Sequence, residues 1–242
     1  MTGQDHATDI AEAPAAMREA MLRVGRTLGV RRGQMVLATG STSDDVYIVQ
    51  AGRLRVTLYP MGGREVIVRD LGSGQIFGEL AAIDALPRSA SIVAINDSSL
   101  IVIPAQMFRD IISENAEAAL WFAGHLTRQI RQLTDRIFEL SAMNVRGRLH
   151  CQLLRMCANA GVINNQADIA VAPTHEHLAA LIGSHREAVT RELSYLAAIG
   201  LLERSGRRLK ICDVGRLANI VRELTGETSA FNVPDKPAEP GA

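Results

Sequence analysis

The sequence predicts an α+β protein: a region of short strands, then one long helix, then a mainly helical region with two short strands. Three observations predict this order. Between Val30 and Ile103, short apolar runs alternate with Gly- and Asp-rich breaks. Between Ile111 and Met143, the apolar residues recur with helical spacing. After Asn144, which is a candidate N-cap, the helical spacing continues and the local charge becomes basic.

Composition limits the function classes. The 242 residues are 47% hydrophobic and 21% charged, so the chain can bury real cores in one large or two ordinary domains. The formal net charge is zero, so any surface that attracts nucleic acid must be local. Three scattered cysteines predict a reducing compartment, and we see neither a signal peptide nor an apolar run of roughly 20 residues. We expect a cytoplasmic protein with no membrane partner.

The first region predicts a small β-barrel or sandwich. Its candidate strands are QMVLATG, DVYIVQAG, RLRVTLYP, REVIVRDL, SASIVAI and SLIVIP. The stretch YPMGGREV predicts a hairpin, because glycine readily adopts the positive φ angles of tight turns. Short strands at this spacing are typical of barrels and sandwiches. We assign residues 19–110 to this domain and residues 1–18 to a flexible, loose or weakly helical lead.

Residues 111–143 predict a long dimerisation helix. Its apolar residues follow a 4-3-4-3-4-3 spacing, the seam of a coiled coil sustained over three heptads. The alternative is an amphipathic helix that lies on its own domain. We favour dimerisation, because the seam is narrow and the helix is longer than a small barrel. The seam consists of Ala119, Ala123, Leu126, Ile130, Leu133, Ile137 and Leu140.

Residues 144–224 predict a winged helix-turn-helix. This segment has eleven Lys and Arg against seven Asp and Glu, a local excess of four positive charges. Thr174 is the N-cap expected for a first helix, and Gly183 tolerates the left-handed conformation of a turn between two helices. A second helix then starts near Ser184 or His185. The closing stretch GLLERSGRRLKICDV predicts two short strands around a Ser-Gly-Arg turn, and residues 225–242 predict a disordered tail.

The second helix has the pattern of a recognition helix. Its outward residues in the N-terminal half are Arg186, Glu187, Thr190 and Arg191, and its inward residues are Val189, Leu193 and Leu196. Arginine can bind guanine with two hydrogen bonds, and glutamate can accept one from cytosine. The alternative is an ordinary solvated helix face, but the basic excess and the wing favour DNA. We expect His175 and His177 to cap or to contact phosphate, since their spacing points them apart and disfavours a shared metal.

The stretch FGELAAIDALPRSA, Phe77–Ala90, combines an apolar segment with two charges. Arg88 can bind a phosphate, assisted by Ser89, and Glu79 can accept a hydrogen bond from a hydroxyl. A ligand with a phosphate on one side and a sugar hydroxyl on the other would satisfy both charges. The alternative is an internal ion pair between Glu79 and Arg88.

The cassette F-G-E-L…R-S-A, the long helix and the stretch SHREAVTREL together resemble the Crp/Fnr family of bacterial transcription regulators, and most of all its cyclic-AMP receptor branch. The resemblance covers roughly residues 28–215. It implies an N-terminal β-roll (double-stranded jelly-roll) sensor that binds a cyclic nucleotide, a dimerisation helix and a C-terminal winged helix-turn-helix. It further implies double-stranded DNA and RNA polymerase as partners, and no covalent or metal cofactor.

The resemblance implies a set of ligand contacts. Glu79 would bind the ribose 2′-hydroxyl, Arg88 would bind the cyclic phosphate, and Ser89 would assist Arg88. The segment around Gly78 and Leu80 would supply backbone contacts. The receptor reads adenine with two adjacent hydroxyl residues of the dimer helix, where this chain has Leu133 and Thr134. Leu133 therefore departs from the family pattern, as does Gln129, where the receptor has an arginine.

The resemblance also implies a DNA site. Arg186, Glu187 and Arg191 occupy the base-reading positions, which implies a palindrome with TGTGA-like half-sites. His185 stands where the family has a small hydroxyl residue that contacts phosphate. The full predicted set is Thr174, His185, Arg186, Glu187, Arg191 and the wing residues Ser205, Gly206 and Arg207.

Three functions stay open on these grounds. The first is a cyclic-AMP-responsive regulator, and the second is a regulator that responds to cyclic GMP, to another effector or to none. The third is a cyclic-nucleotide-binding regulatory subunit that does not bind DNA. We do not expect an enzyme, because the sequence contains no paired nucleophile and base, no H-E-x-x-H and no phosphate-binding G-x-x-x-x-G-K-[ST]. An iron–sulfur or haem sensor is also not expected: no cysteine precedes Cys151, and His125 is the only histidine between residues 7 and 149.

Overall fold

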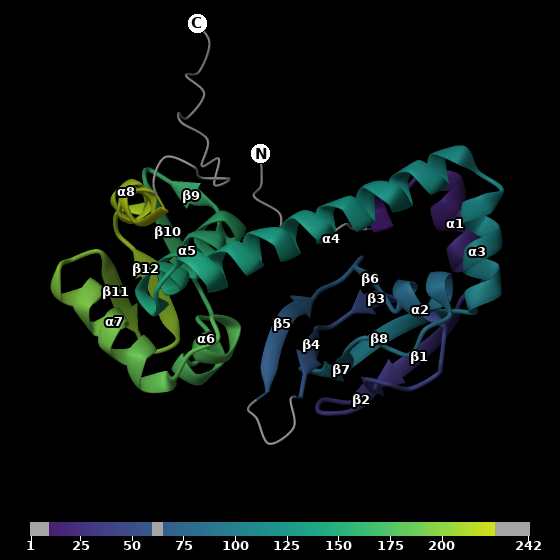
Figure 1. Cartoon of the computed structure of the whole chain (residues 1–242), viewed down its shortest axis with the longest axis horizontal. Coiled ribbons are helices and arrows are strands. Elements are labelled where there is room, and N and C mark those ends of the chain that lie inside the picture. Colours follow the sequence, from purple (N-terminus) through teal and green to yellow (C-terminus); the bar gives the residue numbers. More distant parts are fainter. Residues whose placement is uncertain (1–9, 60–64, 226–242) are drawn as a thin grey trace, which may run out of the picture. The chain divides into compact units, whose positions relative to one another are not determined.

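A computed structural model describes residues 10–59 and 65–225 of the chain. These residues divide into two compact units, an N-terminal unit within His6–Arg131 and a C-terminal unit within Gln132–Ala242. Figure 1 labels the elements of both units, which we describe separately. The boundary lies inside the long helix α4, Ala116–Ala142, whose first turns belong to the N-terminal unit.

The N-terminal unit contains two four-stranded antiparallel sheets, which confirms the predicted β-roll architecture. The first has the order β1-β8-β3-β6 and the second the order β2-β7-β4-β5. The strands are β1 Arg26–Val30, β2 Met35–Leu37, β3 Val46–Ala51, β4 Leu54–Leu58, β5 Val66–Leu71, β6 Ile76–Phe77, β7 Ser91–Ala94 and β8 Ser98–Ile103. The six predicted strands are all present, whereas β1 and β6 were not predicted. Strands β4 and β5 pair as the expected hairpin, whose turn at residues 60–64 lies outside the described residues.

Strand β3 shows why this unit has two apolar cores. Tyr47 and Val49 join the core between the two sheets, which also contains Leu54, Phe77 and Ile92. Val46 and Ile48 point to the opposite face, as successive side chains of a strand must. That face is covered by helices, so β3 is buried on both sides and carries an uninterrupted apolar run.

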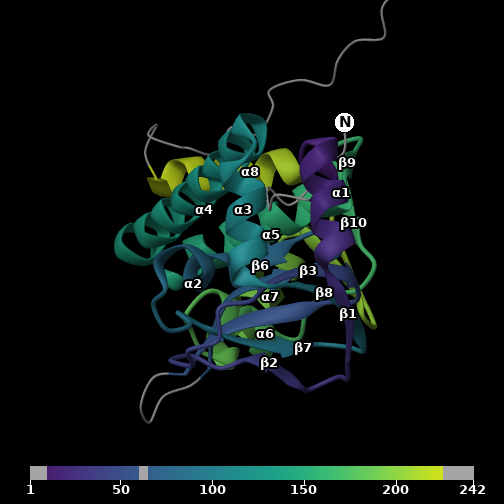
Figure 2. The ribbon, with the colours of Figure 1, turned by 90° about the vertical axis from the view of Figure 1, so that its right-hand side faces the viewer.

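Three elements cover the helical face: α1 Ala15–Val24, α3 Ala105–Ser113 and the first turns of α4 (Figure 2). Helix α1 corrects the prediction of a flexible lead over residues 1–18. Met17 and Met21 lie one helical turn apart and are fully buried, so this segment is part of the fold. Residues 1–9 lie outside the described residues.

The long helix begins later than predicted. Residues 111–113 belong to α3, and the chain breaks before α4 begins at Ala116. Asn115 causes the new start, because its side-chain oxygen accepts hydrogen bonds from the backbone N–H groups of Glu117 at 2.8 Å and Ala118 at 3.2 Å. Side-chain capping by asparagine therefore prevailed over an uninterrupted apolar pattern.

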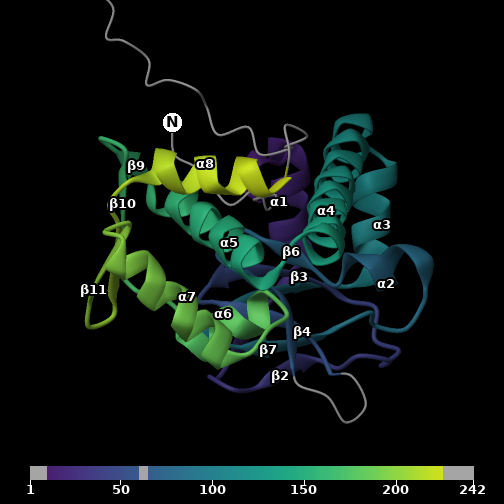
Figure 3. The same cartoon turned by 60° about the vertical axis from the view of Figure 1, so that its left-hand side comes forward.

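The C-terminal unit consists of helices around one sheet with the order β11-β12-β10-β9 (Figure 3). Its elements are α5 Val145–Ala160, β9 Val162–Ile163, β10 Gln166–Ile169, α6 His175–Leu181, α7 Arg186–Ala198, β11 Leu202–Ser205, β12 Arg208–Ile211 and α8 Val214–Thr225. The helix-turn-helix pair α6–α7 and the strand pair β11–β12 confirm the predicted winged architecture. Asn144 caps α5, as expected, by accepting from Gly147 N–H at 3.0 Å.

Three elements of this unit were not predicted: β9, β10 and α8. Asn164 and Asn165 both have positive φ, which joins β9 to β10 through a tight turn. Helix α8 packs on α5 and buries Leu217, Ala218 and Val221 in the core of the unit. The predicted tail, residues 225–242, lies outside the described residues except for Thr225, the last residue of α8.

Candidate ligand site and nucleic-acid interface

The predicted cassette begins at a glycine that no other residue could replace without strain. Gly78 follows β6, has a φ of 82°, and is the N-cap of the short helix α2, Glu79–Asp84. A Cβ at this position would lie 2.8 Å from Arg88 Nη1 and 2.9 Å from the carbonyl oxygen of Asp45. The absence of a side chain lets the guanidinium of Arg88 approach the backbone here.

Arg88 is buried, with 3% of its surface exposed, and is held by acceptors of the roll. It donates to the carbonyl oxygens of Gly78 at 2.6 Å and Asp45 at 2.7 Å, and to Ser43 Oγ at 3.1 Å. A guanidinium has five N–H donors, so two of them have no hydrogen-bond partner among the described residues. Burial lowers the pKa of Arg88 from its ordinary value, but an arginine stays charged. The site thus holds a buried cation, the Arg88 guanidinium, with two N–H donors available to a ligand.

Glu79 is also buried, with 3% exposed, and already has partners from α4. Gln129 Nε2 donates to Glu79 Oε1 at 2.8 Å, and His125 Nε2 lies 3.7 Å from the same oxygen. Burial, the largest single cause, raises the pKa of Glu79, but the contacts with His125 and Gln129 and the charge of Arg69 together outweigh burial, so the net pKa is lowered. No ion pair joins Glu79 to Arg88, so the alternative of an internal pair between them is not what the structure shows.

The sequence did not identify His125 and Gln129 as the side chains that meet Glu79. They lie one helical turn apart on the buried side of α4, next to the buried Phe122. That spacing, on a face about a quarter turn from the predicted seam, was the available signal. Of the other predicted ligand residues, Leu80 and Ser89 belong to the cassette and are exposed. Leu133 and Thr134 are exposed on the part of α4 that belongs to the C-terminal unit.

Helix α4 carries its predicted apolar seam on the outside. Ile130 is 64% exposed, Leu133 52% and Ile137 65%, and of the seven seam residues only Leu126 is partly buried. The face that packs on the N-terminal unit consists instead of Ala118, Phe122 and His125. The first turns of the helix thus lie on their own domain, as the alternative expected, but they do so mainly through a face other than the seam.

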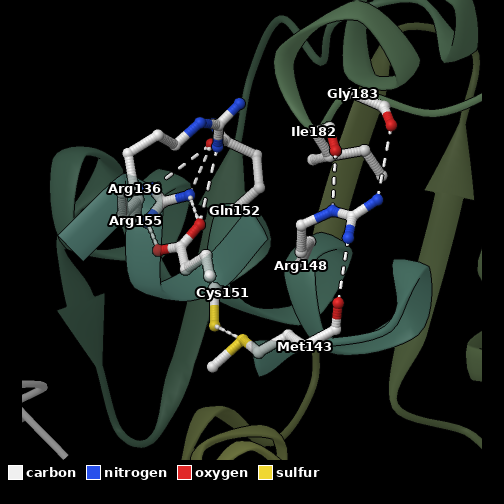
Figure 4. Close-up of polar contacts among 9 residues, drawn as sticks. Arg136, Met143, Arg148, Cys151, Gln152, Arg155, Ile182 and Gly183 are labelled. Atoms are coloured by element: carbon white, nitrogen blue, oxygen red, sulfur yellow. Dashed lines mark hydrogen bonds and ion pairs between the residues drawn. The ribbon is translucent and has the colours of Figure 1, made fainter. Parts of the chain in front are cut away.

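The two helices of the helix-turn-helix are held as predicted. Thr174 Oγ1 accepts from His177 N–H at 3.2 Å and so caps α6. Gly183 has a φ of 60° in the turn between α6 and α7. Arg148 of α5 donates to Ile182 O at 2.8 Å and to Gly183 O at 3.3 Å, and these bonds fix the turn from outside (Figure 4).

The outward face of α7 is open. Arg186, Glu187 and Arg191 are exposed, and within the described part of the chain no side-chain hydrogen bond or ion pair engages them. The inward residues Val189, Leu193 and Leu196 are buried, as predicted. Helix α7 starts at Arg186, with His185 exposed at the N-cap position.

The wing is the turn between β11 and β12. Ser205 pairs with Arg208 at the end of this hairpin, and Gly206 has a φ of 59° in the turn. Ser205, Gly206 and Arg207 are all exposed. The predicted wing residues therefore project from the hairpin as a phosphate contact would require.

The end of α4 is tied firmly to the C-terminal unit (Figure 4). Glu139 is fully buried and bonds to both terminal nitrogens of Arg155, Nη1 at 2.5 Å and Nη2 at 3.1 Å. Arg136 Nη1 lies 3.5 Å from Glu139 Oε2. Arg148 Nη1 donates to the carbonyl oxygen of Met143 at 2.9 Å, directly after the helix ends. No pattern in the sequence indicated this buried ion cluster, which joins α4 to α5.

The described residues contain no group of three or more histidine, cysteine, aspartate or glutamate side chains that could hold a metal ion. Cys151, Cys157 and Cys212 form no disulfide, and burial raises the pKa of Cys151 and of Cys157 to about 12. Over residues 10–59 and 65–225, no helix is both long and apolar enough to cross a membrane.

Comparison with known proteins places both parts of the chain. Residues 28–115 match the family model "Cyclic nucleotide-binding domain", and residues 147–220 match "Crp-like helix-turn-helix domain". The CRP-like cAMP-activated global transcriptional regulator of Mycobacterium tuberculosis (strain CDC 1551 / Oshkosh) is 29% identical over 195 residues, which cover 79% of this chain and 86% of that protein.

Two solved structures share the fold. A CooA mutant from Carboxydothermus hydrogenoformans superposes with a TM-score of 0.72 at 22% identity, covering 83% of this chain and 89% of that chain. The c-di-GMP responsive global regulator CLP of Xanthomonas campestris superposes with a TM-score of 0.69 at 22% identity, covering 82% and 99%.

Proposed function

The chain belongs to the Crp/Fnr family of DNA-binding transcription regulators, with a cyclic nucleotide-binding domain and a Crp-like helix-turn-helix domain, and from this premise we propose that it is a homodimer whose DNA binding is controlled by cyclic AMP. It would act in the cytoplasm as a regulator rather than as an enzyme, on a palindrome with TGTGA-like half-sites. By its resemblance to the family, it would also contact RNA polymerase.

The observation that carries the ligand proposal is Arg88. It is a buried guanidinium with two N–H groups that have no hydrogen-bond partner in the described structure, beside a glycine that keeps the backbone close. A cyclic phosphate carries one negative charge and accepts hydrogen bonds, so it would balance the guanidinium charge and accept from both N–H groups. The relative from Mycobacterium tuberculosis is a cAMP-activated regulator, which supports the same choice.

Glu79 would bind the ribose hydroxyl in place of its present partner or beside it, since a carboxylate accepts several hydrogen bonds. At present it accepts a hydrogen bond from Gln129, so the ligand hydroxyl must replace or join this amide. One neutral donor would substitute for another, which costs little because the buried carboxylate stays satisfied. If the hydroxyl replaces Gln129, the release of this amide changes what α4 contacts, and this offers a physical link from ligand to dimer helix.

The second candidate is the same regulator with another effector or with none. Leu133 cannot donate or accept a hydrogen bond, and it occupies one of the two positions that read adenine in the receptor. The fold also hosts a c-di-GMP responsive regulator, in Xanthomonas campestris. Cyclic GMP, another effector, or ligand-independent binding therefore remain alternatives to cyclic AMP.

The dimer proposal rests on the exposed seam of α4. Seven residues at heptad spacing would pack against the same residues of a second copy, as in a two-stranded coiled coil. A two-fold dimer would present two recognition helices to successive major grooves, about 34 Å apart. The rigid connection of Glu139 to α5 would pass the arrangement of the seam on to the helix-turn-helix.

The DNA contacts would come from α7 and the wing. Arg186 and Arg191 can each bind guanine O6 and N7, and Glu187 can accept from cytosine N4. Thr174, His185 and the wing residues Ser205, Gly206 and Arg207 would contact phosphates and fix the register.

Calorimetry of the full chain with cyclic AMP, cyclic GMP and c-di-GMP tests the effector. We expect micromolar-range binding of cyclic AMP that is lost in Arg88→Ala and retained in Arg23→Ala, which removes an exposed arginine of α1. Circular dichroism of both variants controls for folding. If wild-type protein binds no cyclic AMP but binds another nucleotide, the effector assignment is wrong. If it binds none, and gel shifts on a TGTGA palindrome are unchanged by all three, the protein is ligand-independent.

Arg186→Ala tests the DNA proposal against a regulatory subunit that ignores DNA. We expect specific binding to a TGTGA palindrome to weaken by about 1–3 kcal/mol, with non-specific binding little changed. Arg23→Ala again controls for the loss of one positive charge. Equal DNA affinity of wild type and Arg186→Ala would favour the regulatory subunit.

A further inference from the structure

His175 joins the three elements of the DNA-binding face. It is the first residue of α6, and its Nδ1 lies 2.7 Å from Thr190 Oγ1 on α7. On the other side of the ring, Nε2 contacts Nη1 of Arg204, a residue of β11 in the wing hairpin. Thr190 Oγ1 in turn donates to the carbonyl oxygen of Arg186 at 2.9 Å. Arg204 Nε also donates to Gly206 O in the wing turn, at 3.3 Å.

The donor and the acceptor can be assigned for each hydrogen bond in this series. Arginine has only donors, so Nε2 of His175 must accept from Arg204 and cannot carry a proton. The ring is then neutral with its proton on Nδ1, which donates to Thr190 Oγ1. Thr190 keeps its own hydroxyl proton for the carbonyl of Arg186. One tautomer of His175 satisfies every group from the wing to the start of the recognition helix.

We propose that His175 is a positioning residue for DNA recognition: in the neutral, Nδ1-protonated form it holds the wing in register with the N-terminal half of the recognition helix. The inference rests on the proposed reading role of Arg186, whose backbone carbonyl ends the hydrogen-bond chain. It gives His175 a role through Thr190 and Arg204, rather than the capping or phosphate contact predicted from the sequence.

The charges around the ring make this role sensitive to pH. The cations that face His175 are Arg204 from β11 and Arg186 from α7. Burial, followed by these two charges, lowers the pKa of His175, so the neutral form prevails at pH 7. As the pH falls through this lowered pKa, Nε2 gains a proton, loses its acceptor role and repels Arg204. The wing is therefore expected to stay in register with the recognition helix above that pKa and to lose this register below it.

Imidazole ¹⁵N NMR of the full-length protein tests the tautomer directly. Comparison with His175→Gln identifies the His175 signals among the six histidines. We expect a protonated Nδ1 and an unprotonated Nε2 at neutral pH. A proton on Nε2 would overturn the proposal, and this result does not depend on whether the palindrome is the correct DNA site.

DNA titrations by fluorescence anisotropy test the function. The readout is the ratio of affinities for a TGTGA palindrome and for a scrambled duplex, with the effector that the calorimetry identifies. We expect His175→Ala to lower this ratio about fivefold, the effect of one net hydrogen bond. His175→Asn keeps the donor to Thr190 and His175→Gln keeps the acceptor for Arg204, so each should retain part of the ratio.

The pH profile separates positioning from a general structural role. The wild-type ratio should fall as the pH drops below about 6.5, the ordinary value from which the pKa of His175 is lowered, whereas that of His175→Gln should change much less. Arg204→Ala should lower the ratio, and its effect should be non-additive with that of His175→Ala. Arg208 lies in the same hairpin and pairs with Asp168 of β10, so the effect of Arg208→Ala should be additive with that of His175→Ala. Equal pH profiles for wild type and His175→Gln would overturn the proposal. If wild type does not prefer the palindrome at all, the proposed DNA site fails instead.

Discussion

Each unit of this protein buries a glutamate that contacts α4 or belongs to it, but the two carboxylates have different partners. Glu79 of the N-terminal unit meets an amide, Gln129, and an imidazole, His125. Glu139 of the C-terminal unit meets two guanidinium groups, Arg155 and Arg136. A neutral donor can be exchanged for a ligand hydroxyl, whereas removing a full counter-charge leaves a buried ion unpaired. The contacts of Glu79 suit a site whose partners can be exchanged, whereas those of Glu139 suit a permanent connection between α4 and α5.

The largest expected effect would come from Glu139. Its replacement in Glu139→Gln leaves two arginines without their counter-charge, so we expect the C-terminal unit to lose about 3 kcal/mol of unfolding free energy. The matched change Glu79→Gln should cost about 1 kcal/mol, because the donor of its hydrogen bond, Gln129, is a neutral amide. Urea unfolding followed by circular dichroism reports both units, and fluorescence of the single tryptophan, Trp121, reports the N-terminal one. Equal losses in both variants would remove the distinction between the two glutamates.

A smaller effect distinguishes two glycines with positive φ. Gly78→Ala should destabilise the N-terminal unit by about 2 kcal/mol, since the left-handed conformation alone costs 1–2 kcal/mol and a Cβ would also meet Asp45 O at 2.9 Å. Gly183→Ala should cost about 1 kcal/mol, because its Cβ would meet only Leu140 Cδ2, at 3.4 Å. Thermal unfolding of the two variants gives the order. A larger loss for Gly183→Ala would mean that the turn of the helix-turn-helix is the tighter of the two.

Helix caps should contribute about equally in the two units. Asn115→Ala removes the cap of α4 and Thr174→Ala that of α6, and each should cost about 1 kcal/mol. Trp121 fluorescence should detect the first change and not the second. If Thr174→Ala also shifted the Trp121 transition, the two units would unfold together and could not be compared separately.

The smallest effect concerns pH. The net lowering of the Glu79 pKa means that its ionised form stabilises the folded N-terminal unit above the unfolded value near 4.5 and that this contribution is lost as pH falls through the folded pKa. Wild type should therefore exceed Glu79→Gln in stability at pH 7, and the difference should shrink below about pH 4.5. A difference that grows toward acidic pH would show that burial, and not the contacts with Gln129 and His125, decides the direction of the Glu79 pKa shift.

The architecture was largely readable in the sequence. Strand alternation, heptad spacing and the Thr174–Gly183 pattern depend on local geometry, because a period of 2 or 3.6 residues decides which side chains share a face. These patterns predicted the β-roll, the long helix and the helix-turn-helix. Weaker local signals were missed, including the cap at Asn115 and the tight turn at Asn164 and Asn165.

Contacts between distant residues were decided by the tertiary structure. The sequence determined which residue types the cassette and recognition helix contain: Glu79, Arg88, Arg186, Glu187 and Arg191. Only the packing of α4 on the roll gave Glu79 its partners 50 residues away, and only the packing of α5 buried Glu139 beside Arg155. Likewise, His175, Thr190 and Arg204 come from three elements, and no spacing along the chain encodes their meeting. Pairings of this kind depend on how whole elements pack, which periodicity alone does not specify.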